Sequence, residues 1–390
     1  MTASQKFFEI YQKEPDAMAF TPYRICPLGA HVDHQLGWIT GLAIDRGIHI
    51  AYGAKQNGVV EIRSMQFDKR AQWHVASVPS SPEGDWADHL RGATKALAAR
   101  YTLRVGVCAV IQGELPIGGL SSSAAVIITF LSALAKVNGI SISEREMIEI
   151  SREAENEYVG VACGKLDQSC EVYCKKNHLL YMDMKDDTIE LVPEPENMKP
   201  YKIAIFFSGL ERSLAASKYN MRTDECRAAA YSLLAYAGMD YGKISSTNLR
   251  DVPYEVFVEH GHKLPDSLRR RAEHWFGEIE RVRLGVEAWR KGDIEEFGRL
   301  VFESGRSSID KYEAGSPELK RMYEIMCETD GIYGGRFSGA GFKGCCMALI
   351  DPSREAQILE SVKEKYCASF PHLADKYSAH VCVSADGVKL

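Results

Sequence analysis

The chain has 390 residues, of which 45% are hydrophobic and 26% are charged, and its net charge is −6 at pH 7. These values predict a globular protein with one large or two ordinary domains. A negative net charge argues against a nucleic-acid partner held by overall charge, but it permits a local site for a small anion. No apolar run approaches the roughly 18 residues of a membrane span, so no membrane partner is predicted.

The eleven cysteines show no C-x-x-C spacing, and the first residues do not resemble a signal peptide. A chain of this size and composition does not need disulfides to be stable. We therefore expect reduced thiols and a cytoplasmic protein. Cys163, Cys170 and Cys174 do not match a zinc pattern, and we expect them to be structural.

The spacing of apolar residues predicts the elements in chain order. Strands are expected at 39–52 (with a turn at its glycines), 59–65, 105–115 and 202–210, and helices at 86–101, 124–137, 142–160 and 268–293. The charged stretch 184–200 contains three prolines and is predicted to be a domain connection. Because strands and helices alternate without a regular βαβ order, the sequence favours an α+β fold over a Rossmann sheet.

The strongest local pattern is ELPIGGLSSSAAVIITF at 114–130. Pro116, Gly118 and Gly119 form a loop with little side-chain bulk, and Ser121–Ser123 lead into the apolar helix. Free backbone N–H groups and the helix dipole make such a helix start attractive to phosphate. The serine hydroxyls can add contacts to phosphate or to Mg²⁺. The alternative is a plain turn before a serine-capped helix, and the absence of Gly-Lys-Ser/Thr excludes a Walker A loop.

Two carboxylates follow in EAENEYVGVACGKLDQ at 153–168. Glu155 lies on a predicted helix and can ligate Mg²⁺, whereas Asp167 follows a Cys-Gly turn and can act as a base. Taken alone, either residue is also compatible with an ordinary surface or capping acid.

The segment FSGAGFKGCC at 337–346 allows close approach of the backbone to a ligand, because its side chains are small or absent at four positions. It lacks the G-x-G-x-x-G register followed by a helix, so a dinucleotide site is disfavoured. A tight hairpin is the alternative.

The segment RICPLGAHVDH at 24–34 gathers Arg24, His31, Asp33 and His34 around a Gly-Ala pair. A metal site is disfavoured, because no nearby acid or cysteine completes a ligand shell. A hydrogen-bonding cup for a polyol fits better, with Arg24 placed to steady an anion.

In this order the motifs resemble those of the sugar kinases of the GHMP superfamily, and galactokinases most closely. RICPLGAHVDH resembles R-x-N-x-x-G-E-H-x-D-Y, PIGGLSSSA resembles P-x-x-x-G-L-S-S-S-A, and RFSGAGFKGC resembles R-x-(T/S)-G-(G/A)-G-F-G-G-C. CGKLDQ, ERSLAASKYNMR (211–222) and DWADHLRG (85–92) also resemble segments of that family. The similarity covers roughly residues 20–350.

This resemblance implies a two-domain α+β fold, with domains 1–200 and 201–390 and the active site in the cleft between them. It implies phosphoryl transfer from ATP to the anomeric hydroxyl of a sugar. Asp167 would be the base and Arg24 would stabilise charge, while Ser123 and Glu155 would hold Mg²⁺. Sugar contacts would come from Ala30, His31, Asp33, Gly164, Tyr219 and Arg212. The nucleotide would contact Trp86, Pro116, Gly118, Gly119, Leu120, Ser121, Ser122, Ser123, Ala124, Gly339 and Gly341.

Ala30 departs from the galactokinase pattern, in which a glutamate accepts a hydrogen bond from the C6 hydroxyl of the sugar. A glutamate at ~4 Å from a C6 carboxylate would cost about 1–4 kcal/mol, a preference of roughly 10- to 1,000-fold. The alanine therefore implies D-galacturonate as acceptor, and GAHVDHQ resembles the galacturonokinases. Arg212 and Lys165 are candidate partners for the carboxylate on charge alone.

Three alternatives stay open: a galactokinase that tolerates Ala30, a kinase of another uronic acid such as glucuronate, and a non-catalytic sugar sensor. Against the sensor, the serine loop, Glu155, Asp167 and Arg24 are all present. Two further departures are a serine loop that is one residue shorter and Lys343 in place of a glycine. The sequence does not decide between monomer and dimer.

Overall fold

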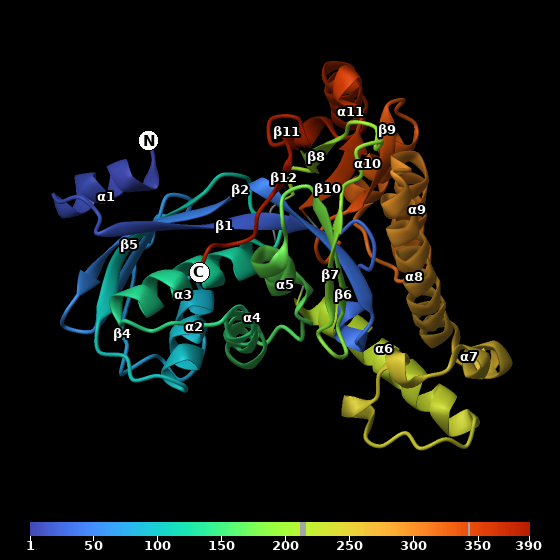
Figure 1. Ribbon diagram of the computed structural model, residues 1–390, viewed down its shortest axis with the longest axis horizontal. Coiled ribbons are helices and arrows are strands. Elements are labelled where there is room, and N and C mark those ends of the chain that lie inside the picture. Colours follow the sequence, from blue (N-terminus) through green and yellow to red (C-terminus); the bar gives the residue numbers. More distant parts are fainter. Residues whose placement is uncertain (211–215, 342–343) are drawn as a thin grey trace.

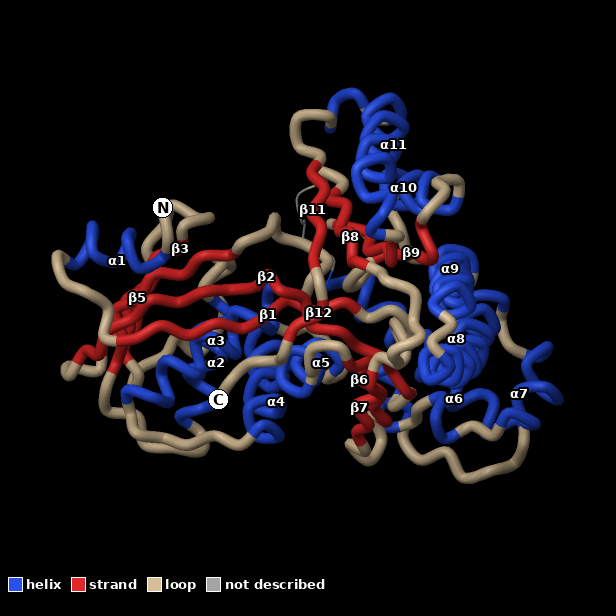
Figure 2. Tube along the Cα trace, turned by 45° about the horizontal axis from the view of Figure 1, so that its top comes forward, coloured by secondary structure: helices blue, strands red, loops and turns tan. Residues whose placement is uncertain are grey.

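The computed structural model describes residues 1–210, 216–341 and 344–390, and only the backbone of 216–218. Figures 1 and 2 show a first sheet with helices against one face, and a second, smaller sheet beside it. The first sheet contains β1 (Ala17–Ile25), β2 (Trp38–Lys55), β3 (Val59–Ser64), β4 (Ala71–His74), β5 (Gly106–Gly113), β6 (His178–Asp183), β7 (Ile189–Pro193) and β12 (Ser384–Ala385). The second contains β8 (Lys202–Phe207), β9 (Ile332–Phe337), β10 (Cys345–Ile350) and β11 (Ser378–Cys382).

The strand orders are β4-β3-β5-β2-β6-β7, with β1 and β12 also on β2, and β11-β8-β10-β9. The helices before residue 200 are α1 (Ala3–Tyr11), α2 (Asp88–Ala98), α3 (Ser122–Val137), α4 (Glu144–Glu153) and α5 (Leu166–Tyr173). Those after it are α6 (Ala216–Tyr236), α7 (Tyr254–His260), α8 (Asp266–Lys291), α9 (Ile294–Asp310), α10 (Pro317–Cys327) and α11 (Glu355–Ser369). The mixture of mainly antiparallel sheets and helices confirms the α+β prediction.

The expected turn within 39–52 is wrong, because β2 runs unbroken from Trp38 to Lys55. Its glycines serve packing instead. A Cβ atom on Gly41 would lie 2.2 Å from the sulfur of Cys170, and one on Gly47 would lie 2.1 Å from the carbonyl oxygen of Thr21. Neighbouring chain segments thus approach β2 so closely that a side chain has no room at either position.

The other predicted strands and helices are present, with somewhat different bounds. The predicted helix 142–160 is divided: α4 ends at Glu153, and a π-helical turn (Ala154–Val159) follows before Gly160 adopts φ +85°. The predicted connection 184–200 contains β7, which pairs antiparallel with β6. Its charges do not prevent a strand, because Glu190 lies on the outside and pairs with Arg290 at 2.6 Å.

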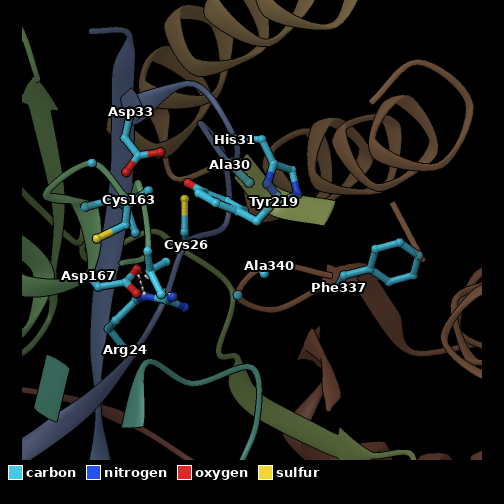
Figure 3. Close-up of a pocket in the computed structure, with 14 residues that line it drawn as sticks. Arg24, Cys26, Ala30, His31, Asp33, Cys163, Asp167, Tyr219, Phe337 and Ala340 are labelled. Carbon is cyan, nitrogen blue, oxygen red and sulfur yellow. Dashed lines mark hydrogen bonds and ion pairs between the residues drawn. The ribbon is translucent and has the colours of Figure 1, made fainter. Parts of the chain in front are cut away.

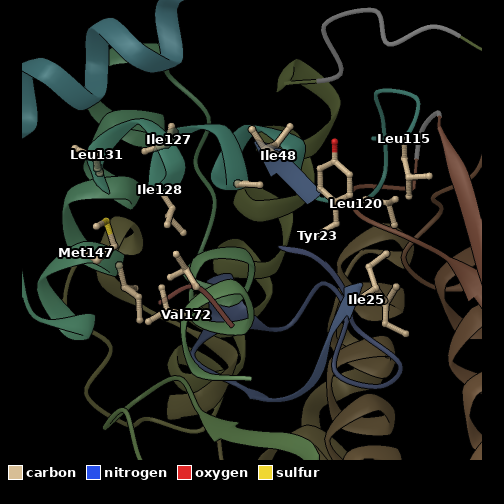
Figure 4. Close-up of a cluster of buried hydrophobic side chains, with 14 of the residues drawn as sticks. Tyr23, Ile25, Ile48, Leu115, Leu120, Ile127, Ile128, Leu131, Met147 and Val172 are labelled. Carbon is tan, nitrogen blue, oxygen red and sulfur yellow. The ribbon is translucent and has the colours of Figure 1, made fainter. Parts of the chain in front are cut away.

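A core of buried apolar side chains joins α3 to the first sheet (Figure 4). Tyr23 and Ile25, on either side of Arg24, are 2% and 0% exposed. Leu115 and Leu120, which flank the glycine loop, are 3% and 1% exposed. The core therefore fixes the backbone at both ends of the loop and around the arginine.

Strands up to β7, and the late strand β12, belong to the first sheet, and β8 begins the second; the domain boundary near residue 200 stays a prediction. The last residues nevertheless return to the first sheet through β12. There the N–H of Gly387 donates to the carbonyl of Cys174 at 2.7 Å, and that of Val388 donates to the carbonyl of Glu171 at 2.8 Å.

All eleven cysteines are free thiols. Across the described ranges, no helix combines the length and the apolar character that crossing a membrane requires.

Candidate active site

A buried ion pair joins strand β1 to helix α5. Arg24 donates to Oδ1 of Asp167 from Nε at 3.0 Å and from Nη2 at 2.7 Å. The arginine side chain is 3% exposed and the aspartate side chain 31%. Burial alone would lower the pKa of Arg24, but the charge of Asp167, the hydrogen bond to it and the neighbouring thiols of Cys170 and Cys26 together raise this pKa above its ordinary value. The guanidinium is therefore permanently charged, and the carboxylate beside it is open to a ligand (Figure 3).

The pair lies in a small pocket to which widely separated parts of the chain contribute (Figure 3). Its lining consists of Arg24, Cys26, Ala30, His31, Asp33, Val161, Cys163, Gly164, Leu166, Asp167, Tyr219, Phe337, Gly339 and Ala340. Of the predicted sugar contacts, Ala30, His31, Asp33, Gly164 and Tyr219 all belong to this lining. Gly164 approaches so closely that an added Cβ would lie 2.3 Å from Oδ2 of Asp33.

Helix α8 holds the loop that carries Ala30. The backbone N–H of Gly29 donates to Oε1 of Glu278 at 2.8 Å, and the carbonyl of Ala30 lies 3.2 Å from Nε2 of His274. Gly29 has φ +91°, and an added Cβ there would lie 2.6 Å from the Cα of Ile39. These contacts leave residue 30 little freedom to move away from the pocket.

Glu278 is completely buried, and it lies between two guanidinium groups. Its carboxylate is 2.8 Å from Arg281 and 3.5 Å from Arg336. Burial would raise the pKa of Glu278, but the two arginines lower it to about 2. The sequence prediction missed this anchor, because it considered only the apolar face of the helix. The signal was available: 271, 274 and 278 repeat at helical spacing on the same face as Trp275 and Val282.

Asp33 is 9% exposed and lies above Asp167 in the view of Figure 3, with Cys163 between them. Burial raises its pKa to about 6, and the negative charge of Asp167 adds to the effect. The pocket therefore contains two carboxylates of different character. One is paired with arginine, and the other titrates near neutral pH.

His31 stacks on Tyr312 with ring centroids 4.3 Å apart and planes 8° apart. Burial, together with the positive charge of Arg336, lowers the pKa of His31 well below its ordinary value, so the ring is neutral. Its Nε2 is buried without a hydrogen-bond partner among the described residues. His34 does not line the pocket, because its ring lies between the hydroxyl of Tyr312 and the amide of Gln35, at 3.1 Å from each.

A second, larger groove of about 890 Å³ lies beside the start of α3. Its lining consists of Tyr23, Ile48, Ser64, Gln66, Phe67, Gly84, Asp85, Trp86, His89, Ile111, Pro116, Ile117, Ser122, Ser123, Val126, Phe207, Gly209, Leu210, Gly344 and Lys376. Trp86 stacks on Phe67 with centroids 5.7 Å apart and planes 5° apart. A flat aromatic pair at one side and a serine-bearing helix start fit a nucleotide.

Trp86, Pro116, Ser122 and Ser123 are the predicted nucleotide residues that line this groove. The remaining ones do not. Leu120 and Ala124 are core residues, 1% and 0% exposed. Ser121, 8% exposed with φ +59°, precedes the helix in a left-handed conformation. Gly339 lines the smaller pocket instead, and a Cβ on Gly341 would lie 3.1 Å from the ring of Phe337. Gly118 and Gly119 contact the turn between β9 and β10.

The glycine-rich segment 337–346 forms the turn of a hairpin, and its backbone also lies close to another part of the chain. Strands β9 and β10 pair antiparallel, and the turn between them packs on the serine loop. A Cβ on Gly118 would lie 3.1 Å from the Cα of Gly344, and one on Gly339 would lie 2.9 Å from the Cα of Gly119. The carbonyl of Gly119 also lies 3.5 Å from Nη1 of Arg24. Two segments thus meet backbone to backbone at the junction of the pocket and the groove, and the side chain of Arg24 joins them from β1.

Glu155 sits in the π-helical turn and is 5% exposed. Its Oε2 accepts from Nε2 of Gln168 at 2.6 Å and lies 3.6 Å from the sulfur of Cys163. Carboxylate and hydroxyl oxygens are ligands that suit Mg²⁺, so the chemistry of Glu155 and Ser123 fits this ion. In the described part of the chain, no group of three or more His, Cys, Asp or Glu side chains could hold a metal ion.

Lys165 is not available to a ligand in the pocket. Its ammonium pairs with Asp187 and lies 3.7 Å from Glu149, and it is absent from the lining. The prediction that it meets a sugar carboxylate is therefore wrong, because charges on neighbouring segments already compensate it. Arg212 and Lys343 lie outside the described residues.

Comparison with known proteins agrees with this geometry. The family description "GHMP kinases N terminal domain" matches residues 88–175, and "GHMP kinases C terminal" matches 286–367. The chain is 38% identical to a galacturonokinase of Arabidopsis thaliana, over 95% of this chain and 92% of that protein. It is 32% identical to a galactokinase of Roseiflexus sp. (strain RS-1), over 98% and 95% respectively.

Among solved structures, galactokinase of Lactococcus lactis in complex with galactose has a TM-score of 0.89, with 25% identity over 99% of this chain and 98% of that chain. A mevalonate kinase has a TM-score of 0.66 at 17% identity, over 95% of this chain and 100% of that one, which is a likeness of fold alone. The chain belongs to the GHMP kinase family, as one of its galactokinase-like, ATP-dependent sugar kinases. This excludes the sugar-sensor alternative.

We expect Gly119→Ala to reduce kcat/KM for ATP at least roughly tenfold and to lower stability. Its Cβ would lie 2.7 Å from the sulfur of Cys345, at a residue with φ +86°. Gly139→Ala is the matched control, since Gly139 has φ +67° with nothing within 4 Å of an added Cβ. It carries only the backbone cost of about 1–2 kcal/mol. Steady-state kinetics and urea unfolding measure the activity and the stability of the two variants. If Gly119→Ala and Gly139→Ala had equal effects, the argument from close backbone approach at Gly119 would be contradicted.

We expect Asp33→Asn to stabilise the protein at pH 8 and to slow sugar phosphorylation. Because the pKa of Asp33 is raised to about 6, the folded state holds this proton more tightly than the unfolded state. Stability then falls as pH rises from about 4 to 6, and the deficit persists above. Asparagine has no charge to bury, so we expect it to raise the free energy of unfolding by about 1–3 kcal/mol at pH 8. Near pH 4 the variant and the wild type should be equally stable in this respect. Urea unfolding across this pH range measures it.

Asp330→Asn is the control for that titration, because Asp330 is 90% exposed. It should leave the pH profile of stability unchanged. An Asp33→Asn protein less stable than wild type at pH 8 would contradict a raised pKa for Asp33.

Proposed function

We propose that this chain transfers the γ-phosphoryl group of ATP to the anomeric hydroxyl of D-galacturonate, giving galacturonate 1-phosphate. The observation that carries the proposal is the side chain of Ala30 in the wall of the sugar pocket. The galacturonokinase relative, at 38% identity, supports it. Free thiols suit a reducing compartment, so the cytoplasm is the proposed location.

The charges behind Ala30 favour a substrate carboxylate. Glu278 holds the loop, and it faces both Arg281 and Arg336. One buried carboxylate against two guanidiniums leaves an excess of one positive charge. A glutamate at position 30 would balance that positive charge. With alanine the charge stays available to attract a carboxylate of the acceptor. Galactose, which has a neutral C6 hydroxyl, gains nothing from it.

Asp167 accepts the proton of the anomeric hydroxyl as its oxygen attacks the γ-phosphorus of ATP. The bond between that phosphorus and the bridging oxygen breaks, and ADP leaves with the electron pair. The ion pair with Arg24 holds the carboxylate of Asp167 in place beside the acceptor, so the base acts by its position. Phosphoryl transfer depends largely on such positioning and on neutralising charge in the transition state.

The remaining sugar contacts fall to groups around the same pocket. Asp33 accepts hydrogen bonds from sugar hydroxyls, and the backbone at Gly164 and the hydroxyl of Tyr219 complete the wall. Nε2 of His31, which is buried without a partner among the described residues, is satisfied when the sugar binds.

Ser123 and Glu155 are the residues that hold Mg²⁺ in this proposal. The chemistry that the ion supplies in phosphoryl transfer is neutralisation of phosphate charge. Gln168 donates to Glu155 at 2.6 Å and adjoins Asp167 in sequence. The same short helix therefore orients the base and a metal ligand.

Galactose is the second candidate acceptor. Its support is the likeness to the Lactococcus lactis enzyme complexed with galactose and to the Roseiflexus galactokinase. Glucuronate is a third, since the charge argument concerns C6 and does not distinguish the two configurations at C4.

We expect Asp167→Asn to lower kcat roughly 10²- to 10⁴-fold, the usual contribution of a general base. Asparagine keeps an oxygen that can accept from Arg24, so the protein should fold and bind ATP. Asp187→Asn is the control, since that carboxylate pairs with Lys165 outside the pocket. It should keep the wild-type rate. A coupled ADP-release assay and titration calorimetry measure both, and wild-type turnover by Asp167→Asn would remove this residue from the mechanism.

The decisive experiment compares kcat/KM for galacturonate, galactose and glucuronate. We expect galacturonate to be preferred, and Ala30→Glu to lower the galacturonate-to-galactose ratio roughly 10- to 1,000-fold, because two like charges then meet. Ala30→Gln has the same size without the charge and should lower the ratio much less. Equal ratios in all three proteins would refute the role of Ala30, and galactose ahead in the wild type would identify a galactokinase.

A further inference from the structure

The described lining of the nucleotide groove contains few charged side chains. In the part of its lining that the structure describes, Lys376 is the one Lys or Arg side chain, and Asp85 is the one acid. The triphosphate of ATP is polyanionic, and helix dipoles compensate only a fraction of one charge. A lysine near the terminal phosphates would add to the neutralisation of phosphate charge that we propose for Mg²⁺ and Arg24.

Lys376 lies in the segment between α11 and β11, and its side chain is exposed to solvent at the groove. Its backbone N–H donates to the carbonyl of Leu373 at 2.9 Å, which fixes the start of the side chain. It packs directly on Gly209, which has φ +78°, and a Cβ there would lie 2.7 Å from the Cβ of Lys376.

From Gly209 a continuous set of contacts leads to the serine loop. The neighbouring Ser208 donates to the carbonyl of Gly344, from its backbone N at 2.9 Å and from its hydroxyl at 2.8 Å. Gly344 in turn lies against Gly118, at 3.1 Å from an added Cβ. Lys376 is thereby placed on the same side of the groove as the glycine loops. The stacked Trp86 and Phe67 come from a different part of the chain.

We propose that the ammonium of Lys376 binds the terminal phosphate oxygens of ATP. Lysine is a compact, strongly hydrated point charge on a flexible stem, which suits phosphate groups without demanding a fixed geometry. The serine loop precedes residue 200, whereas Lys376 follows it, so bound ATP is held from both halves of the chain. The proposal applies whichever sugar is the acceptor.

Lys376→Met tests it by removing the charge while keeping a long apolar side chain. We expect KM for ATP to rise roughly tenfold to a hundredfold, the usual range for losing a charge-assisted hydrogen bond. KM for the sugar should stay within about twofold, and Lys376→Arg should restore most of the ATP affinity. Lys363→Met, an exposed lysine on α11, is the matched control and should match wild type.

Titration calorimetry with ATP, ADP and AMP then locates the contact. A contact to the terminal phosphates is supported if Lys376→Met binds ATP more weakly than wild type but binds AMP equally well. ADP binding is weakened as well if the lysine also contacts the β-phosphate. Equal weakening of all three nucleotides would place Lys376 at the nucleoside, and unchanged binding of all three would remove it from the site. Either result overturns the proposal.

Discussion

The buried pair of Arg24 and Asp167 is the interaction on which the rest of the site depends. Burying a guanidinium that is only 3% exposed would be strongly destabilising without a charged partner. The partner is also the proposed base, so the strand that carries the arginine fixes the position of the reacting carboxylate. Nη1 of Arg24 also lies 3.5 Å from the carbonyl oxygen of Gly119, so the same group contacts the serine-glycine loop. The proposed sugar pocket and the loop beside the proposed nucleotide groove are thus both in contact with one side chain.

The second constraint is the contact of backbones without side chains. Gly118 and Gly119 meet Gly339 and Gly344, and any Cβ at this junction would lie about as close as 3 Å to another backbone. Such contact lets two loops from distant parts of the chain share one surface with little adjustable bulk between them. Catalysis of phosphoryl transfer relies on positions held to fractions of an ångström, and a rigid junction of this kind supplies them.

Local patterns predicted the parts of the site that depend on local chemistry. The apolar helix α3 and its serine-glycine start are visible in sequence, because burial and helix geometry impose them. Long-range contacts were not predictable. Gly41 and Gly47 resemble turn residues, yet they lie in one strand because other segments press against them. Lys165 resembled a free cation until the fold brought Asp187 beside it. The residues that contact Gly41, Gly47 and Lys165 are all distant from them in the sequence, so no spacing rule could reveal these contacts.

The specificity at C6 that we propose rests on where the fold places unbalanced charge. The described pocket lining holds two carboxylates, Asp33 and Asp167, and one cation, Arg24, which Asp167 already engages. Burial raises the pKa of Asp33 to about 6, with a smaller contribution from the negative charge of Asp167, and a third acid in the wall would add further repulsion. The excess positive charge lies instead behind Ala30, where Glu278 meets two arginines. An acceptor that carries its own carboxylate brings the missing negative charge to that side of the pocket only while it is bound. The free enzyme is thereby spared a further buried acid, and the neutral sugar lacks the interaction.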